Sequence, residues 1–282
     1  MKKSYFKMSL IVFVISLFSN TLFAQRAYVN INVGYGFRMS SQNLHFFNFY
    51  NSTSGNIINT NEQVNVSLGK GLNIGGTFGY MINKNIGTEL GVSYLIGGKS
   101  KAKVADLDGT SDYTLSSKML RINPTIVIAS GFEKINPYAK FGLIIGSGSI
   151  MYKEIYNNAG VGIMKMKLNG GIALGLSSGV GAIYKMNDKM SFYGELNMVN
   201  LSYAPTKGKI TDYSYNGVDG LVDLTTNEKE IEFVDSYTYN SNNQPSDSKP
   251  SIKLKQKLPF GSFGLILGWR INLKGHMKIN PK

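Results

Sequence analysis

The stretch 258–273, LPFGSFGLILGWRINL, constrains the fold more than any other part of the chain. From Phe263 onward a large apolar residue occupies every second position, and most positions between them hold glycine or a polar residue, including Arg270. A period of two places these two sets on opposite faces of a strand. Because the second face is largely glycine and carries an arginine, we expect it to line a narrow polar lumen while the apolar face contacts lipid. The stretch therefore predicts the closing strand of a transmembrane β-barrel.

The N-terminus has the pattern of an export signal. Three lysines precede a short apolar run, residues 8–18, and the small Ala24 provides a cleavage point before Gln25. A membrane-spanning helix needs about 20 apolar residues, so an anchoring helix is the weaker alternative. We expect residues 1–24 to be a signal peptide and residues 25–273 to form the barrel. Residues 274–282 would then form a short periplasmic tail.

Composition fits an exported sheet protein and limits its chemistry. The chain has 32 glycines, 17 tyrosines and 15 phenylalanines but no cysteine, so disulfides and thiolate chemistry are excluded. Its formal charge is +13. The lysines are scattered over predicted turns and loops, which favours anionic lipid head groups and lipopolysaccharide phosphates over nucleic acid as partners.

Eight alternating segments can be drawn along the chain. They are residues 27–37, 68–80, 86–96, 118–130, 137–149, 165–184, 190–203 and 258–273. Connections after the first, third, fifth and seventh are long, the longest being residues 204–257, and the other three are tight. Pro124 lies inside the fourth segment and predicts a bulge. We expect an all-β fold, an eight-stranded antiparallel up-and-down transmembrane β-barrel with short periplasmic turns and long extracellular loops.

Two bands of outward aromatic residues support membrane insertion. One set falls at the loop ends of the predicted strands and the other at the turn ends, as amphipathic rings at two interfaces would. The predicted girdle consists of Tyr35, Phe37 and Tyr94 at the loop ends, and Tyr80, Tyr184, Phe192 and Trp269 at the turn ends. A soluble β-sandwich or lipocalin-like barrel is the alternative, but it explains neither the two bands nor the alternation of loop lengths.

The inward face carries a set of charges that a small lumen must bring together. These residues are Glu89, Arg121, Lys140, Glu195 and Arg270. Glu89, Lys140 and Glu195 lie at similar distances from the turns, so we expect them to pair directly, with Arg121 higher and Arg270 lower. An unpaired buried charge is very unfavourable, which predicts a salt-bridged plug. A gate or narrow ion path through the same charges is the alternative.

Three phrases carry a resemblance to a known family. They are LNIGGTFGYMINKNIGTELGVSYLIGG, RINPTIVIASGFEKINPYAKFGLIIGSG and GSFGLILGWRINL. The chain resembles the OmpA-like or OprF-like eight-stranded outer-membrane β-barrel superfamily, and in particular the small barrels of Bacteroidota. The resemblance implies a Gram-negative outer-membrane location and the barrel-assembly machinery as a partner during biogenesis. Two features depart from it: the chain continues past Leu273, and it has no second domain for peptidoglycan.

We expect no enzymatic activity, no cofactor and no metal. The only histidines, His45 and His276, fall in a loop and in the tail, and the loop acids match no metal-binding spacing. The longest loop does carry aromatic residues suited to protein or glycan contact: Tyr213, Tyr215, Phe233, Tyr237 and Tyr239. A self-packed hairpin formed by 208–217 and 229–240 is the alternative for these rings.

These patterns predict an outer-membrane β-barrel protein with a side-chain-plugged lumen, acting in envelope structure or in surface interaction through its extracellular loops. A narrow ion or small-solute channel is one alternative. A barrel component of a secretion or assembly apparatus is another.

Overall fold

The computed structural model describes residues 27–39, 50–55, 59–238 and 246–273. The predicted signal peptide and tail lie outside these residues. Nearly all the described regular structure is β-strand, apart from one short helix, α2 (Thr226–Lys229). No helix in the described part of the chain is long and apolar enough to cross a membrane.

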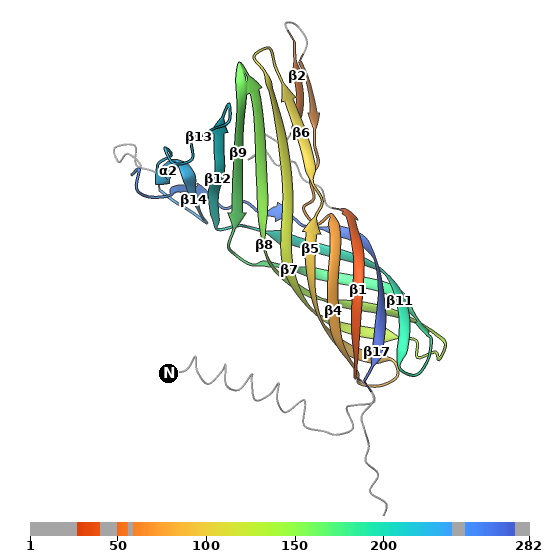
Figure 1. Cartoon of the computed structure of the whole chain (residues 1–282). Helices are drawn as coiled ribbons and strands as arrows, with labels where there is room; N and C mark the ends of the chain where they lie inside the picture. The colour runs from red at the N-terminus through yellow and green to blue at the C-terminus, as the bar shows by residue number, and fades with distance from the viewer. Residues whose placement is uncertain (1–26, 40–49, 56–58, 239–245, 274–282) are drawn as a thin grey trace, which may run out of the picture.

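Eight antiparallel strands close into a barrel, as the alternating segments predicted (Figure 1). They are β1 (Ala27–Arg38), β4 (Gly71–Met81), β5 (Ile86–Gly97), β7 (Thr110–Ala129), β8 (Ile135–Asn158), β10 (Ala173–Lys185), β11 (Met190–Tyr203) and β17 (Ser262–Asn272). Each strand pairs with the next, and β17 pairs with β1 along its whole length, from Ser262 opposite Arg38 to Asn272 opposite Tyr28. The closing strand inferred from the sequence is therefore confirmed.

Asparagine side chains accept backbone hydrogen bonds in the tight turns, and the turns after β4 and β10 share one pattern. Oδ1 of Asn83 accepts hydrogen bonds from the backbone N–H of Asn85 (2.8 Å) and Ile86 (2.7 Å). Oδ1 of Asn187 does the same for Lys189 and Met190, each at 2.9 Å. These Asx turns reverse the chain in a few residues, which explains why these connections are short.

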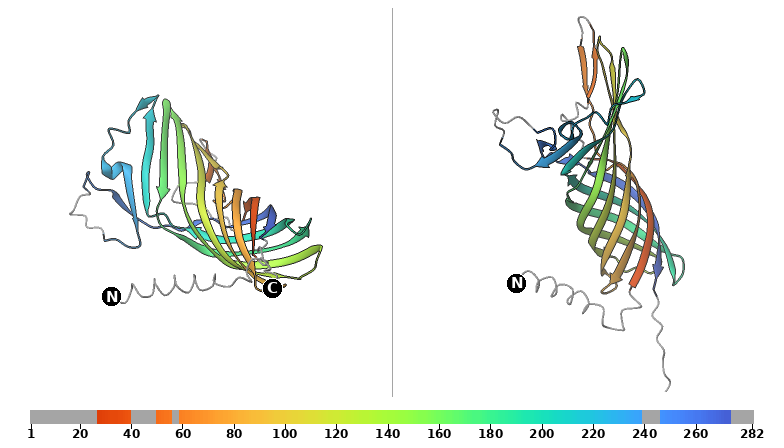
Figure 2. Two further views of the ribbon diagram at one scale, coloured as in Figure 1. Left: turned by 60° about the horizontal axis from the view of Figure 1, so that its bottom comes forward. Right: turned by 60° about the vertical axis from the view of Figure 1, so that its left-hand side comes forward.

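Two barrel strands are much longer than predicted. The strands β7 and β8 pair without interruption at their outer halves and leave the barrel as one ribbon, from Arg121 opposite Gly146 up to Thr110 opposite Asn157. They form the centre of an external sheet that rises beyond one side of the barrel (Figures 1 and 2). The other strands of this sheet are β2 (Tyr50–Ser54), β3 (Asn59–Gln63), β6 (Ser100–Ala105), β9 (Gly160–Asn169), β12 (Lys207–Tyr215), β13 (Val218–Asp219), β14 (Glu230–Val234) and β15 (Ser251–Leu254).

The predicted sixth strand is in fact two strands. Residues 160–169 form β9 in the external sheet, and only residues 173–185 form the barrel strand β10. The break falls at Gly170 and Gly171, whose φ angles are +78° and +77°. Residues with a side chain rarely adopt such angles, so two consecutive glycines let the chain leave the external sheet and re-enter the barrel.

The last predicted strand is also interrupted. Leu258–Pro259 form the short β16 against the end of β11, and β17 begins only at Ser262. Between them Phe260 is fully buried, and its backbone N–H donates to the carbonyl of Leu201 at 2.8 Å. The segment before β17 therefore turns inward over the mouth of the barrel.

Pro124 does not form the predicted bulge. The β7–β8 register has the same offset on both sides, with Ile122 opposite Ile145 and Thr125 opposite Gly142. The side-chain amide of Asn123 donates to the carbonyl of Leu143, which stands opposite Pro124. A side-chain donor thus serves the carbonyl that the proline, having no N–H, leaves without a ladder bond.

Candidate functional site

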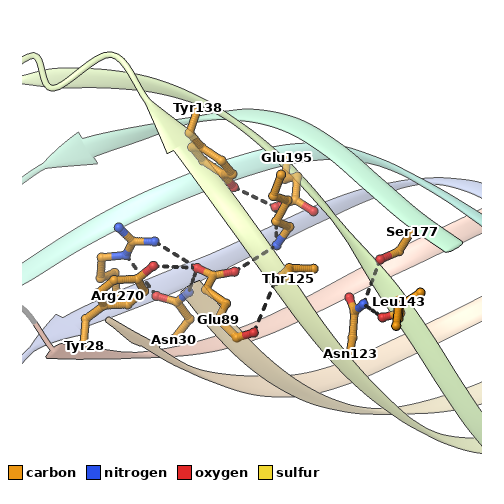
Figure 3. A network of polar contacts seen from close by, with 11 residues as sticks. Tyr28, Asn30, Glu89, Asn123, Thr125, Tyr138, Leu143, Ser177, Glu195 and Arg270 are labelled. Atoms are coloured by element: carbon orange, nitrogen blue, oxygen red, sulfur yellow. Dashed lines mark hydrogen bonds and ion pairs between the residues drawn. The ribbon is translucent and has the colours of Figure 1, made fainter. Parts of the chain in front are cut away.

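The centre of the lumen is a belt of ion pairs contributed by strands from opposite sides of the barrel (Figure 3). Nζ of Lys140 lies 2.7 Å from Oε2 of Glu195 and 3.5 Å from Oε2 of Glu89. Nη2 of Arg270 lies 3.3 Å from Oε1 of Glu89. We call Glu89, Lys140, Glu195 and Arg270 the charge belt. It contains the predicted trio and adds Arg270 directly to it.

Neutral side chains complete the belt. The hydroxyl of Tyr28 donates to Glu89 at 2.9 Å, and the hydroxyl of Tyr138 donates to Glu195 at 2.8 Å. The guanidinium carbon of Arg270 lies 3.6 Å from the centre of the Tyr28 ring, a cation–π contact. Removing one partner from a buried ion pair of this kind is strongly destabilising, because the other charge is left uncompensated.

Lumen glycines make room for this network. A Cβ atom on Gly79 would collide with the ring of Tyr28, and one on Gly179 would lie 2.7 Å from Oε1 of Glu195. The glycine-rich inward face is therefore the space that the large polar side chains of the neighbouring strands occupy. The sequence showed the glycines but not which side chains fill the space beside them.

Arg121, the fifth predicted charge, stays outside the charge belt. It lies further toward the extracellular side on β7 and is 2 % exposed. Its Nη1 donates to Oδ1 of Asn73 at 3.1 Å, whereas Nε and Nη2 have no hydrogen-bond partner among the described residues. The predicted five-member charge set is thus four connected residues and one separate cation.

The extracellular mouth of the lumen is closed by apolar side chains, which the sequence analysis did not anticipate. We call this cluster the apolar plug: Leu68, Leu95, Met119, Ile144, Val199, Leu201, Tyr203, Leu258 and Phe260. Phe260 and Tyr203 pack edge to face with ring centres 5.7 Å apart. The Tyr203 hydroxyl donates to the carbonyls of Gly148 (2.8 Å) and Gly170 (2.6 Å). Six of its nine members lie on the barrel strands β5, β7, β8 and β11, and Leu68, Leu258 and Phe260 come from the connections 64–70 and 257–261. Strand periodicity does not show that these connections fold over the mouth and complete the cluster.

Two cavities lie on either side of the charge belt. An open vestibule of about 680 Å³ faces the periplasmic turns, with Tyr28 and Arg270 in its wall. A small cavity of about 80 Å³ lies between the belt and the plug, with Arg121, Lys140 and Ile144 in its wall. The lumen is therefore filled at two levels, by ion pairs in its centre and by apolar side chains at its extracellular end.

The outer surface of the barrel is apolar. The predicted girdle residues Tyr35, Phe37, Tyr94, Tyr184 and Trp269 are exposed, while Tyr80 and Phe192 are half-buried. Phe192 packs edge to face on Trp269, with 5.5 Å between the ring centres. Tyr184, Phe192 and Trp269 stand side by side on β10, β11 and β17, so they form one band near the turns.

The external sheet has one face whose residues are at the same alternate positions as the inward residues of β7 and β8. This face is rich in tyrosine. Across four strands, Tyr113, Glu154, Met164 and Tyr213 stand opposite one another in one row. Tyr156, Gly162 and Tyr215 form the row nearer the tip. We call Tyr113, Tyr152, Tyr156, Tyr213 and Tyr215 the tyrosine face. Tyr113 and Tyr152 are buried, whereas Tyr156 and Tyr215 near the tip and Tyr213 on the outer strand β12 are exposed.

Burial changes the acidity of the lower tyrosines. Burial raises the pKa of the Tyr113 hydroxyl, and burial together with the nearby Glu154 carboxylate raises the pKa of Tyr152. The Tyr152 hydroxyl donates to Oε2 of Glu154 at 3.1 Å. Both tyrosines therefore stay neutral hydrogen-bond donors.

The other predicted recognition residues differ in their placement. Phe233 is 5 % exposed and belongs to the core, so it is not a surface residue. Tyr237 is exposed, and Tyr239 lies outside the described residues, as does His45. The predicted self-packed hairpin is also wrong for most of its length, since β12 pairs with β14 only from Lys207 to Lys209 and pairs with β9 throughout.

The opposite face of the external sheet gathers lysines, so the expectation that they are scattered over turns and loops is wrong. We call this set the lysine face: Lys101, Lys103, Lys153, Lys165, Lys167, Lys207 and Lys209. Lys153 stands directly opposite Lys165, and Lys167 opposite Lys209. Only strand register reveals this, because the seven residues come from four strands that are separated in the sequence.

Four acids share the lysine face: Asp112, Asp212, Glu230 and Glu232. Lys165 pairs with Asp212 at 2.6 Å and Lys209 with Glu230 at 2.8 Å. The face nevertheless keeps an excess of positive charge. Within the described residues no group of three or more His, Cys, Asp or Glu side chains could hold a metal ion.

Fold and site together define a membrane-inserted β-barrel with a filled lumen and an external sheet. The chain belongs to the outer membrane protein beta-barrel domain family, whose match covers residues 10–220. That match contains every barrel strand except β17. The protein is therefore an outer-membrane β-barrel protein of the bacterial envelope. A comparison with curated proteins gave no match.

Proposed function

We propose that this protein is a non-conducting outer-membrane barrel that holds a rigid external sheet for interaction at the cell surface. The observation that carries the proposal is the continuous β7–β8 ribbon, which pairs from within the barrel to the tip of the external sheet. Because strand pairing continues across the membrane boundary, the barrel fixes the orientation of the sheet. Recognition surfaces held on a rigid scaffold lose little entropy on binding.

The filled lumen argues against the narrow-channel alternative. An ion would have to pass between Lys140 and Glu195, which are 2.7 Å apart, and then through the apolar plug. Both barriers lie in series along the only axis of the barrel. Hydrophobic constrictions and tight ion pairs each oppose conduction. We propose an interaction role without catalysis or transport.

The lysine face suggests phosphate groups of lipopolysaccharide as its partner. On β8 the outward positions change from Phe141, Leu143 and Ile145 in the membrane to Lys153 above it. The lysines thus stand just beyond the lipid-facing surface. Like charges directly opposite in a sheet are destabilising. In the pairs Lys153–Lys165 and Lys167–Lys209, Asp212 compensates Lys165 and Glu230 compensates Lys209, so Lys153 and Lys167 remain available for an anionic partner.

A groove on this face provides a defined place for such a partner. It measures about 540 Å³ and contains Lys167, Lys207 and Lys209 in its wall, together with Glu230 and Glu232. Of the three lysines in the groove wall, Lys209 is paired with Glu230, whereas Lys167 and Lys207 form no ion pair with a described residue. The tyrosine face on the other side of the sheet offers amphipathic rings for a protein or glycan partner.

Three further proposals concern export, membrane insertion and kinship. We propose that residues 1–24 are removed as a signal peptide and that the barrel-assembly machinery inserts the chain. We further propose kinship with the small OmpA-like barrels of Bacteroidota, based on the phrases quoted from the sequence.

Binding to lipopolysaccharide tests the lysine-face proposal. The triple variant K167Q/K207Q/K209Q, in detergent micelles, should lose at least tenfold in affinity for lipopolysaccharide but bind dephosphorylated lipopolysaccharide as the native protein does. The matched control K84Q/K185Q/K189Q removes the same charge from the periplasmic turns and should bind normally. Equal affinity of both variants would refute phosphate recognition by the lysine face.

Planar-bilayer recording tests the closed barrel. The native protein should show no stable unitary conductance steps. Steady steps that disappear on charge reversal at Lys140 would establish a conducting path through the belt and rule out the proposed closed state.

A further inference from the structure

Arg121 is a buried cation for which the charge belt provides no counter-charge. Among the described residues its one hydrogen-bond partner is the neutral amide oxygen of Asn73, 3.1 Å from Nη1. Nε and Nη2 are buried and have no acceptor among the described residues. A guanidinium presents five N–H donors, and burying them unpaired is strongly unfavourable. The surroundings of Arg121 are therefore incomplete in both charge and hydrogen bonding.

The charges of the lumen do not balance. Arg121, Lys140 and Arg270 face the two carboxylates of Glu89 and Glu195. Glu89 is shared by Lys140 and Arg270, and Glu195 is held by Lys140 and the Tyr138 hydroxyl. Neither carboxylate forms an ion pair with Arg121 in the described structure. One positive charge remains in excess, and it is located at Arg121.

Arg121 lies in the wall of the cavity of about 80 Å³ between the belt and the plug. Lys140 and Glu195 also belong to this wall, as do Ile144 and Val199 of the apolar plug. A water molecule takes up about 30 Å³ in the liquid, so the space suits one small ion with one or two waters.

Polar groups from other strands converge on the same cavity. Asn73, Ser93, Asn123 and Ser177 are part of its wall. Nδ2 of Asn123 donates to Oγ of Ser177 at 2.7 Å, which leaves the Ser177 hydroxyl proton free to donate (Figure 3). The cavity thus combines an unpaired guanidinium with hydroxyl donors, the combination that binds an anion.

We propose that this cavity binds one small monovalent inorganic anion of the size of chloride or bromide. The Arg121 guanidinium in the wall donates to it, and hydroxyl groups of the wall complete its shell. The anion neutralises the excess charge of the lumen and connects β7 to the strands around the cavity. The Glu195 carboxylate in the same wall does not repel it decisively, because Lys140 lies 2.7 Å from that carboxylate.

Bromide diffraction on the native protein tests this directly. Crystals grown in bromide should show one anomalous peak within about 3.5 Å of the Arg121 guanidinium, the reach of a hydrogen bond to a large anion. In parallel, replacing gluconate with chloride at constant ionic strength should raise Tm by about 3 °C for each tenfold excess over Kd. No peak together with equal Tm in both salts overturns the proposal and shows a cavity that holds water only.

Variants assign the effect to Arg121. In R121Q the dependence of Tm on chloride should disappear, whereas K118Q, an exposed lysine on the same strand, should retain it. S177A removes one donor from the wall and should reduce the chloride effect if R121Q does not fold. A bromide peak that appears only at molar salt, without any change in Tm, also overturns the proposal.

Discussion

Nζ of Lys140 on β8 lies 2.7 Å from Oε2 of Glu195 on β11 and 3.5 Å from Oε2 of Glu89 on β5. A single ammonium group thus connects carboxylates from two separated strands across the lumen. The relationship explains why an eight-stranded barrel can bury charge at its centre: every member of the belt is compensated, and the compensation comes from opposite walls.

Removing the central ammonium should destabilise the barrel strongly. In K140M, Glu89 would keep its ion pair with Arg270 but Glu195 would keep only the hydrogen bond from the Tyr138 hydroxyl, so we expect the free energy of unfolding to fall by about 3–5 kcal/mol. Urea unfolding in lipid vesicles measures this. The control K165M breaks the half-exposed pair with Asp212 and should cost no more than about 1 kcal/mol. Similar losses in the two variants would contradict a belt that holds the barrel closed.

Charge on the lipid-facing surface should be penalised according to depth. The L143R substitution places arginine at an outward position, and we expect a loss of about 2–4 kcal/mol if the residue is near the bilayer midplane. Ser147 faces outward on the same strand nearer the extracellular end, so S147R should cost about 0–1 kcal/mol. Vesicle unfolding reports both values, and a larger loss for S147R would contradict the assigned depths of Leu143 and Ser147 in the bilayer. An arginine at inward Ile144 would fail differently, by overfilling the apolar plug.

Truncating the apolar plug should cost stability in proportion to its burial. Phe260 is fully buried against Tyr203, and F260A should lower the free energy of unfolding by about 3–5 kcal/mol. The F132A control truncates an exposed ring in a periplasmic turn and should change stability by less than about 0.5 kcal/mol. If F260A is as stable as F132A, the plug does not contribute to folding.

The cap of α2 gives a test of pH dependence. Hydrogen bonds from the backbone and hydroxyl of Thr225 lower the pKa of Glu228 below its ordinary value. A depressed folded pKa means that this stabilisation is present above the unfolded pKa and is lost as the pH falls through the folded one. NMR titration of T225A should therefore show the Glu228 pKa moving up. The backbone N–H of residue 225 remains in T225A, so the shift is partial, and an unchanged pKa would show that the Thr225 hydroxyl does not lower the pKa of Glu228.

Because the chain contains no cysteine, single introduced thiols can map its topology. Val218 at the external tip and Phe132 in a periplasmic turn are both well exposed. A membrane-impermeant maleimide on intact cells should label V218C and spare F132C, and both should react after lysis. Labelling of F132C on intact cells would place the turns outside. Surface proteolysis should likewise cleave within 204–257 and spare residues 185–189.

Part of this molecule follows from local pattern. The alternation of apolar and polar residues along Phe263–Leu273 and the seven other segments predicted eight strands. It also predicted which residues of each strand face outward, because the backbone of a strand sets a period of two. It also placed Glu89, Lys140, Glu195 and Arg270 on one face. Since a small lumen leaves no room for unpaired charge, their mutual pairing was predictable without coordinates.

The alternation pattern was misleading where a barrel strand continues into the external sheet, because the strands of both have a period of two. The β7 and β8 strands continue beyond the membrane with the same alternation, so nothing local marks the barrel rim, and residues 165–184 read as one strand across Gly170 and Gly171. Pro124 read as a bulge, but the Asn123 amide serves the opposite carbonyl instead.

The sequence by itself determined that the chain forms a closed barrel in a membrane, because alternation, glycine and turn chemistry act over a few residues. Only the tertiary structure decided what the barrel encloses and presents. Register between distant strands gathers the lysine face. The connections 64–70 and 257–261 fold inward and complete the apolar plug, and Arg121 is separated from Glu89 and Glu195. These depend on which side chains meet across the sheet and the lumen, and that information is not contained in any single segment.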